Sequence, residues 1–174
     1  MITMEPHTRK SPNAGRMGKA AEYLVASFCI LVTQGQLNVS TSMVDDEGVD
    51  LVFHQREGTA TLAIQVKARM LSGSAAGRGR FLADIRSQTF TARKDLAMLF
   101  IAVDDEQGRL DTAWLVPSAA FQEREGTPTG QDKYRFSASL KAGTQDQWAP
   151  YRLEPLELPG AILRFLDELE SSDR

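Results

Sequence analysis

The residues that could carry chemistry lie in one stretch, 45–69, with the sequence DDEGVDLVFHQREGTATLAIQVKAR. It reads as two short apolar strands joined by a turn that contains Gly58. Successive side chains of a strand point to opposite faces, so Asp50 points away from its apolar neighbours. In the second strand the same rule puts Gln65 and Lys67 on one face, roughly 7 Å apart. A carboxylate, an amide and an ammonium group thus converge on one hairpin, and they predict a polar site where a purely structural sheet would be apolar.

A helix predicted over residues 14–34 would bring a second carboxylate, that of Glu22. The apolar stripe of this helix repeats at helical spacing and consists of Met17, Ala20, Ala21, Leu24, Val25, Phe28, Leu31 and Val32. At about 100° per residue, Glu22 lies off that stripe on a face of small residues, with Lys19 beside it. Such a face fits close packing or the lining of a cleft, which makes Glu22 a candidate ligand. The alternative is a surface charge near the helix N-terminus.

The rest of the chain predicts an alternation of strands and helices. We expect strands over 37–43, 49–54, 61–67, 80–86, 96–103, 112–116 and 133–140, and helices over 14–34, 89–95, 118–125 and 158–171. The run LAMLFIAV at 96–103 is typical of a strand buried on both faces and is placed at the sheet centre. The order predicts a small α/β sheet flanked by helices. Residues 1–13 are expected to form a flexible arm and residues 14–174 a single domain.

Composition places the chain among ordinary globular proteins. Its 174 residues are 42% hydrophobic and 25% charged, and they include one cysteine, Cys29. A single cysteine excludes an internal disulfide and a multi-cysteine zinc site, and it fits a reducing compartment. No stretch reaches the roughly 20 apolar residues of a membrane span, and no signal peptide is recognisable. We therefore expect a cytoplasmic protein.

The charge is distributed unevenly, although the net charge is only −3. Residues 1–94 carry 12 Lys and Arg against 8 Asp and Glu, whereas residues 95–174 carry 8 against 15. Within 67–94 there are seven basic residues and one acidic residue, Asp84. The small, flexible and basic loop 71–80 could therefore close on a phosphate ligand. The alternative is a solvated loop that is merely rich in arginine.

Three features together resemble the PD-(D/E)XK nuclease superfamily, in particular its Mrr-like restriction endonuclease branch. They are the helical Glu22, the Gly-Val-Asp sequence that opens a strand at Asp50, and the Gln-Val-Lys sequence 65–67 that closes the next strand. The archaeal Holliday-junction resolvases share this layout. The resemblance spans residues 15–116 and implies a restriction-endonuclease-like fold, with a central mixed β-sheet flanked by helices.

Carried onto this sequence, the resemblance implies a metal site with a catalytic lysine. Asp50 would be the central ligand of Mg²⁺ or Mn²⁺, Glu22 an outer ligand, and Gln65 would stand where an acidic ligand is common. Lys67 would orient or deprotonate the attacking water, or stabilise the developing charge. The residues implied to contact DNA are Lys19, Arg69, Arg78 and Arg80. The predicted function is metal-dependent endonucleolytic hydrolysis of DNA. Many nucleases of this fold act as pairs, so a homodimer is the assembly implied, although the sequence locates no two-fold interface.

Two other functions remain open. Gln65 removes one negative charge from the site and lowers the expected metal affinity. The chain could therefore be a catalytically weakened nuclease fold that binds nucleic acid or a protein partner. A third possibility is a structural or toxin-neutralising protein that binds no nucleic acid, and only the negative net charge supports it. For single residues, Asp50 could be an acid that ends a turn, and Gln65 and Lys67 could lie on an exposed strand face.

Overall fold

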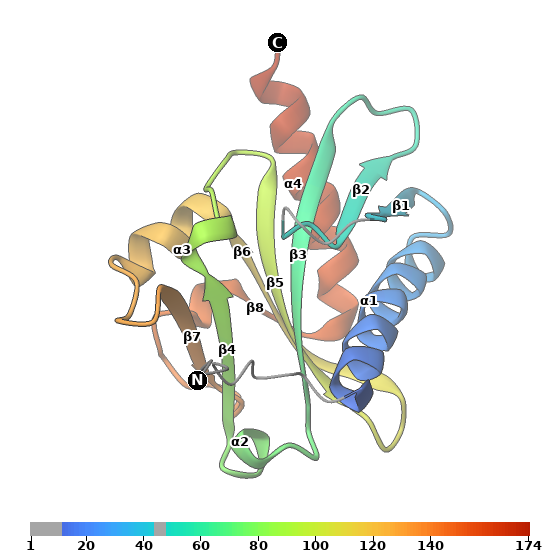
Figure 1. Cartoon of the computed structure of the whole chain (residues 1–174). Coiled ribbons are helices and arrows are strands. Elements are labelled where there is room, and N and C mark those ends of the chain that lie inside the picture. The colour runs from blue at the N-terminus through green and yellow to red at the C-terminus, as the bar shows by residue number, and fades with distance from the viewer. Residues whose placement is uncertain (1–11, 44–47) are drawn as a thin grey trace, which may run out of the picture.

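The computed structural model describes residues 12–43 and 48–174 (Figure 1). Its strands are β1 (Leu37–Thr41), β2 (Leu51–Gln55), β3 (Thr61–Met70), β4 (Arg80–Arg86), β5 (Leu96–Asp104), β6 (Arg109–Pro117), β7 (Lys133–Ser139) and β8 (Arg152–Leu153). Its α-helices are α1 (Pro12–Val32), α2 (Ser74–Gly77), α3 (Ser118–Glu125) and α4 (Leu158–Ser172), with 3₁₀ turns η1 (Ser87–Thr89), η2 (Ala149–Tyr151) and η3 (Pro155–Glu157).

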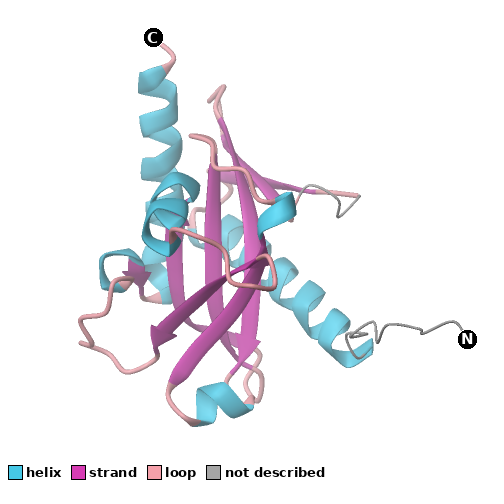
Figure 2. Ribbon diagram, turned by 60° about the vertical axis from the view of Figure 1, so that its left-hand side comes forward, coloured by secondary structure: helices cyan, strands magenta, loops and turns pink. Residues whose placement is uncertain are grey.

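In the described part of the chain, six strands form a mixed sheet in the order β1-β2-β3-β5-β6-β8. β3 and β5 are parallel, and the other neighbours are antiparallel. β4 and β7 form a separate antiparallel ribbon, which crosses one side of the main sheet in Figure 2. The expected α/β fold, a central mixed sheet flanked by helices, is confirmed.

One core lies between the main sheet and the helices α1 and α4. α1 buries Ala21, Val25 and Cys29, which recur every four residues and so share one face. α4 packs on the same cluster through Leu158, Ile162, Leu166 and Leu169. Burial raises the pKa of the Cys29 thiol to about 12, so this residue serves as a core side chain.

A second core, on the other face of the sheet, holds the β4–β7 ribbon. Alternate ribbon side chains are buried there, namely Phe81, Ala83, Ile85, Tyr134, Phe136 and Ala138. Phe136 stacks on Phe100 of β5, with ring centroids 3.6 Å apart. β5 is buried from Leu96 to Val103, because one core covers each of its faces. Its predicted place inside the sheet is confirmed.

Several local predictions were wrong. α1 begins at Pro12, so the expected arm loses its last two residues, and residues 1–11 lie outside the described part. The helix expected over 89–95 is absent, because Ser118 Oγ both receives the Arg93 N–H (2.9 Å) and donates to the Arg93 carbonyl (2.7 Å). The loop 71–80 contains α2. Pairing of β4 with β7 in a sheet of their own was not foreseen, since alternation identifies a buried face but not a pairing partner.

Across residues 12–43 and 48–174, no helix combines the length and apolar character that a membrane span requires.

The hairpin of β2 and β3 is held at its turn by Glu170 of α4. Its Oε1 accepts hydrogen bonds from the Thr59 and Ala60 amides, the latter at 2.7 Å, and Oε2 accepts from the Thr59 hydroxyl at 3.2 Å. These bonds lower the pKa of Glu170 below its ordinary value of 4.5. A hollow of about 360 Å³ adjoins this turn, and none of the predicted site residues lines it.

Glu170→Gln should weaken the acid dependence of folding stability. A carboxyl group whose pKa is depressed by folding contributes stability above its unfolded pKa, and this contribution is lost as the pH falls through the folded pKa. We expect a lower urea midpoint at pH 7 and a shallower decline below about pH 5 than in the wild type. Glu168→Gln, an exposed acid on the same helix, is the control. A pH profile of Glu170→Gln that matches the wild type would show that the turn does not depend on this carboxylate.

Candidate functional site

Asp50 lies alongside the middle of β3 and makes contacts on both sides of Gln65. Its backbone N–H donates to the Ile64 carbonyl at 2.9 Å. Its Oδ2 accepts the Val66 N–H at 2.6 Å. The regular pairing of β2 with β3 ends at Leu51 and Ile64, and the Asp50 side chain takes over from there as the partner of β3. The acid is thus fixed beside the Gln65-Val66-Lys67 segment.

Gly48 brings the backbone close to Gln65. It has a φ of +69°, and a Cβ at this position would lie 3.2 Å from Gln65 Nε2 and 3.6 Å from Oε1. Glycine therefore serves two purposes, because it adopts the left-handed conformation without strain and leaves room for the amide. The sequence motif Gly-Val-Asp has a structural reason for its glycine. Residues 44–47, which include Asp45, Asp46 and Glu47, lie outside the described part.

The alternation of a β-strand determines which face of the sheet each side chain of β3 occupies. Leu62, Ile64 and Val66 belong to the core beneath α1 and α4. Gln65 and Lys67 alternate with them and lie on the opposite face, half-buried, as predicted. The N–H and C=O of one residue point to the same edge of a strand. The Val66 carbonyl therefore points to the edge where its N–H meets Asp50.

The helix α1 adds a carboxylate and an ammonium group. Lys19 Nζ lies 2.6 Å from Glu22 Oε2, and the Glu22 side chain is only 13% exposed. The hydrogen bond to Glu22 raises the pKa of Lys19, and the negative charge of Asp50 acts in the same direction. The ammonium group of Lys19 therefore feels the charges of both Glu22 and Asp50, and its direct contact is with Glu22.

The predicted ligands are of the kind that a hard, oxygen-seeking cation binds. Glu22 and Asp50 would supply carboxylate oxygens, and the Gln65 amide and Val66 carbonyl would supply neutral ones. No cluster of three or more His, Cys, Asp and Glu suited to a metal occurs within the described ranges. Two carboxylates are nevertheless a common number for Mg²⁺, which keeps several waters and also binds substrate phosphates. These residue types would suit Mg²⁺ or Mn²⁺ better than a softer metal.

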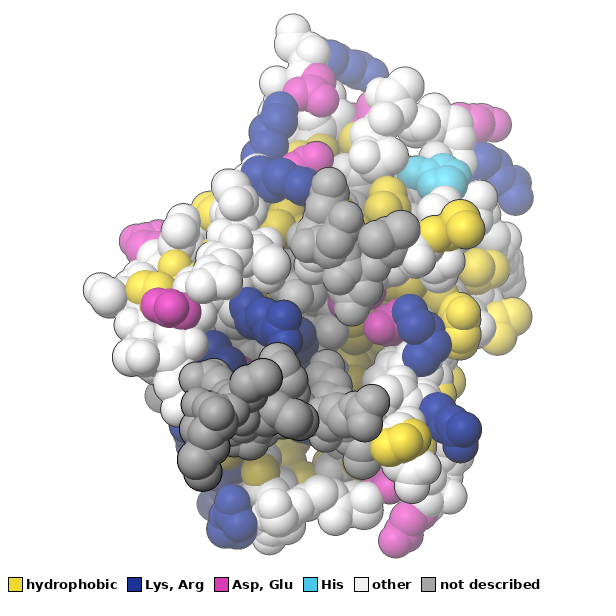
Figure 3. All heavy atoms as spheres, viewed as in Figure 1, with side chains coloured by type: hydrophobic (Ala, Val, Ile, Leu, Met, Phe, Trp, Pro, Cys, Tyr) yellow, Lys and Arg dark blue, Asp and Glu magenta, His cyan; other side chains and the backbone are white. Residues whose placement is uncertain are grey.

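The predicted DNA-contacting arginines lie at the end of β3, at the start of β4 and in the segment between these strands. Arg69 Nε donates to the Leu82 carbonyl at 2.8 Å, and its Nη1 donates to the Ala68 carbonyl at 2.8 Å. Partial desolvation lowers the pKa of Arg69, and the negative charge of Asp84 partly offsets this shift. Arg80 donates to the Ser137 hydroxyl of β7, and Arg78 follows α2. In Figure 3, Lys and Arg side chains gather over α1 and over β4.

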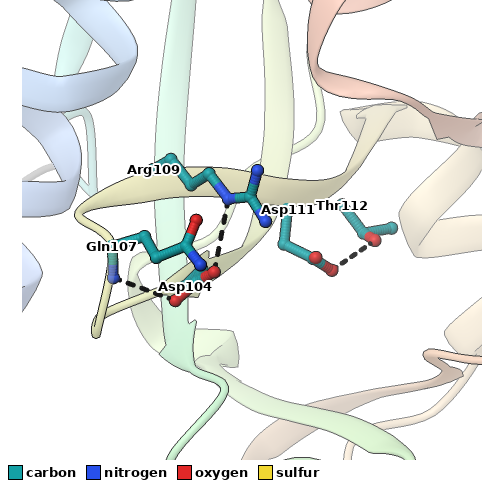
Figure 4. A network of polar contacts seen from close by, with 5 residues as sticks. All are labelled: Asp104, Gln107, Arg109, Asp111 and Thr112. Atoms are coloured by element: carbon teal, nitrogen blue, oxygen red, sulfur yellow. Dashed lines mark hydrogen bonds and ion pairs between the residues drawn. The ribbon is translucent and has the colours of Figure 1, made fainter.

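Asp104 and Asp105, at the end of β5 and just after it, each accept two hydrogen bonds that hold a neighbouring turn or loop in place. Figure 4 shows Asp104 accepting from the Gln107 amide at 3.1 Å and from Arg109 Nε at 3.3 Å, which closes the β5–β6 turn. Asp105 accepts the Ser72 hydroxyl at 2.6 Å and the Ser72 amide at 3.2 Å. The hydroxyl contact lowers the pKa of Asp105. The loop 71–80, which was expected to be flexible, is therefore anchored at its start by Ser72.

Comparisons with known proteins identify the fold. No protein-family model matches the sequence, and no curated protein matches it. The structure of I-Ssp6803I, a bacterial homing endonuclease, is similar, with a TM-score of 0.55 over 94% of this chain and 99% of that one at 17% identity. The match to the crystal structure of MepB covers 68% of this chain and 87% of that one at 13% identity, and its TM-score of 0.35 is too low to indicate a shared fold. The chain therefore shares its overall fold with this bacterial homing endonuclease.

Gly48→Ala should disturb the site more than it disturbs the fold. The left-handed backbone costs an alanine about 1–2 kcal/mol, and the new methyl group would push the Gln65 amide from its position. We expect weaker Mn²⁺ binding by calorimetry together with a lowered urea midpoint. Gly108→Ala is the matched control, since Gly108 has a φ of +64° and an added methyl group there would meet nothing within 4 Å. Equal Mn²⁺ affinity in both variants would contradict a role for the Gly48–Gln65 contact.

Proposed function

We propose that this protein is a divalent-metal-dependent nuclease that hydrolyses phosphodiester bonds in DNA. The observation that carries the proposal is the 2.6 Å hydrogen bond from the Val66 amide to Asp50 Oδ2. It places a carboxylate beside a strand segment that carries an amide, a backbone carbonyl and a lysine. The nuclease-like fold and the bacterial homing endonuclease with a similar structure agree with the proposal.

Asp50 is the central metal ligand in this proposal, with Glu22, Gln65 and the Val66 carbonyl as further oxygen donors. A hydrogen bond from one amide uses only one of the several acceptor positions of a carboxylate. The same bond keeps Asp50 in place, so little reorganisation is needed when the cation binds. A bound Mg²⁺ would polarise the phosphoryl oxygen and lower the pKa of water.

Lys67 is the proposed catalytic lysine. It lies two residues from Gln65 on the same face of β3, opposite the apolar core. An ammonium group at this position can hold a scissile phosphate and stabilise the negative charge that develops on it. It can also orient the attacking water for in-line displacement.

Lys19 has a second proposed role beside the acids. Its ammonium group pairs with Glu22 and interacts with the charge of Asp50. The lysine therefore moderates the repulsion between two carboxylates that must share a site. When DNA binds, the same group is within the reach of a phosphate next to the scissile one.

Two observations favour an alternative, a nuclease fold that binds nucleic acid or a partner without cutting. Gln65 provides no charge, and Lys19 already neutralises Glu22. Both features weaken the attraction for a cation. Calorimetric titration with Mg²⁺ and Mn²⁺ separates the two functions, because a catalytic site requires cation binding that depends on Asp50.

Asp50→Asn and Lys67→Ala should each abolish metal-dependent cleavage while the protein stays folded. Asparagine retains an acceptor for the Val66 amide but loses the charge. We expect cleavage of supercoiled DNA in Mg²⁺ to fall by about a hundredfold or more in each variant, with an unchanged circular dichroism spectrum. Glu168→Gln, exposed on α4, is the control and should cut normally. Cleavage by Asp50→Asn at the wild-type rate would contradict the proposed site.

Gln65→Glu should raise the affinity for the cation. The added carboxylate increases the negative charge of the proposed ligands. Glutamate has the same size and shape as the glutamine that it replaces, so the strand should accommodate it. We expect Mn²⁺ binding to strengthen several-fold by calorimetry. Gln122→Glu, on the surface of α3, supplies the same charge away from the site. If both substitutions have the same effect on Mn²⁺ affinity, Gln65 is not a ligand.

A further inference from the structure

The outer face of the β4–β7 ribbon is a charged surface with a fixed pattern. The inner side chains of both strands are buried in the second core, so the strands cannot rotate. The cross-strand pairs on the outer face are Arg80 with Ser139, Leu82 with Ser137, Asp84 with Arg135, and Arg86 with Lys133. The two strands together carry four basic residues, Arg80, Arg86, Lys133 and Arg135, and one acidic residue, Asp84.

Asp84 lies at the centre of this surface, surrounded by basic side chains. Arg135 donates to it through Nε at 2.9 Å and through Nη2 at 3.4 Å. The side chain of Asp84 is 36% exposed and that of Arg135 is 61% exposed. The hydrogen bond from Arg135 lowers the pKa of Asp84, and the charges of Lys133 and Arg69 lower it further. The acid is therefore ionised at neutral pH and fixes the orientation of the guanidinium group.

We propose that the outer face of the β4–β7 ribbon enters the major groove of duplex DNA and reads base edges through the Asp84–Arg135 pair. The inference rests on the proposed function, of which it specifies the substrate and the recognition surface. A surface that contacted only the phosphate backbone would have no use for a central carboxylate, which phosphates repel. Base edges in the major groove offer amino donors to a carboxylate and the guanine O6 and N7 acceptors to an arginine.

The dimensions of the ribbon fit this groove. The major groove of B-form DNA is about 12 Å wide and admits a two-stranded β-ribbon. Arg86 follows Arg80 by six positions, so their Cα atoms are roughly 20 Å apart along an extended strand. A ribbon inserted with its centre over the bases would bring these two arginines to the phosphate chains that border the groove. The ends of the ribbon then bind phosphates, and its centre reads sequence.

The ribbon is continuous with the proposed catalytic site. Arg69 of β3 binds the Leu82 carbonyl of β4 and interacts electrostatically with Asp84. β3 also carries Lys67, two residues away on the same face. A duplex held by the ribbon would thus pass beside the site that cuts it. Double-stranded RNA is a poor fit, because its major groove is too deep and narrow for side chains to read.

Binding without cleavage tests the ribbon independently of catalysis. Affinity for a duplex DNA oligonucleotide pool would be measured in EDTA at several salt concentrations, with the full chain. Arg80→Ala and Arg86→Ala should weaken binding to all sequences and reduce the slope of log K against log salt by about one each. Arg164→Ala is the control, since Arg164 is exposed on α4 across the sheet from the ribbon. Unchanged slopes in both ribbon variants would overturn the proposed phosphate contacts.

Selection from a randomised duplex pool tests base reading. Arg135→Ala should lose preference at one or two positions by about tenfold. The exchange Asp84→Arg with Arg135→Asp keeps the ion pair and the net charge, so it should fold normally and yet select a different sequence. The same sequence preference in the exchanged protein as in the wild type would mean that the pair is only structural. Methylation of guanine N7, in the major groove, should interfere with wild-type binding.

The possible failures are distinguishable. If methylation interferes only at adenine N3, in the minor groove, or if double-stranded RNA binds more tightly than DNA, the ribbon assignment is overturned. If cleavage depends on Asp50 but the ribbon variants bind duplex DNA normally, the proposed function survives and this inference fails. If the ribbon variants behave as expected but Asp50→Asn still cleaves, the catalytic proposal fails and the ribbon assignment stands.

Discussion

The hydrogen bond between the Val66 amide and Asp50 Oδ2 lies where regular pairing between β2 and β3 ends. Regular pairing between β2 and β3 stops at Leu51 and Ile64, and β3 continues to Met70. Without a partner, the edge of β3 beyond Ile64 would present unsatisfied backbone groups. A carboxylate in place of the next strand residue satisfies the amide and brings a negative charge to this edge. One hydrogen bond therefore serves both the sheet and the proposed chemistry.

The two faces of the sheet have different tasks. The face beneath α1 and α4 is a continuous apolar core, and α1 presents Glu22 at the border of that core. The other face is apolar under the ribbon, but on β3 it carries Gln65 and Lys67. These polar side chains of β3 lie on the face of the second core but do not belong to it, while the first core covers the opposite face of the strand. A charged site can exist there without the cost of burying unpaired charges.

Much of this arrangement follows from the sequence alone. The alternation in 80–86 and the apolar run in 96–103 predicted β4 and the inner strand β5, because side-chain periodicity reports burial directly. The faces of Gln65 and Lys67 followed from the same rule. The Asp50–Val66 bond did not, since it depends on the residue at which β2 stops pairing. The roles of Asp105 and Glu170 were also missed, because both bind backbone or hydroxyl groups that are distant in sequence. The close approach of Gly48 to Gln65 had one signal in the sequence, namely a glycine two positions before Asp50.

The most direct test of the metal site is a crystal structure of the protein with Mn²⁺, read by anomalous scattering. The proposal predicts an anomalous peak coordinated by Asp50, with Glu22, Gln65 or the Val66 carbonyl among its other protein ligands at the distances typical of oxygen donors. It also predicts that the peak disappears in Asp50→Asn. A Mn²⁺ peak that leaves Asp50 uncoordinated, in crystals of protein that cleaves DNA, would contradict the account.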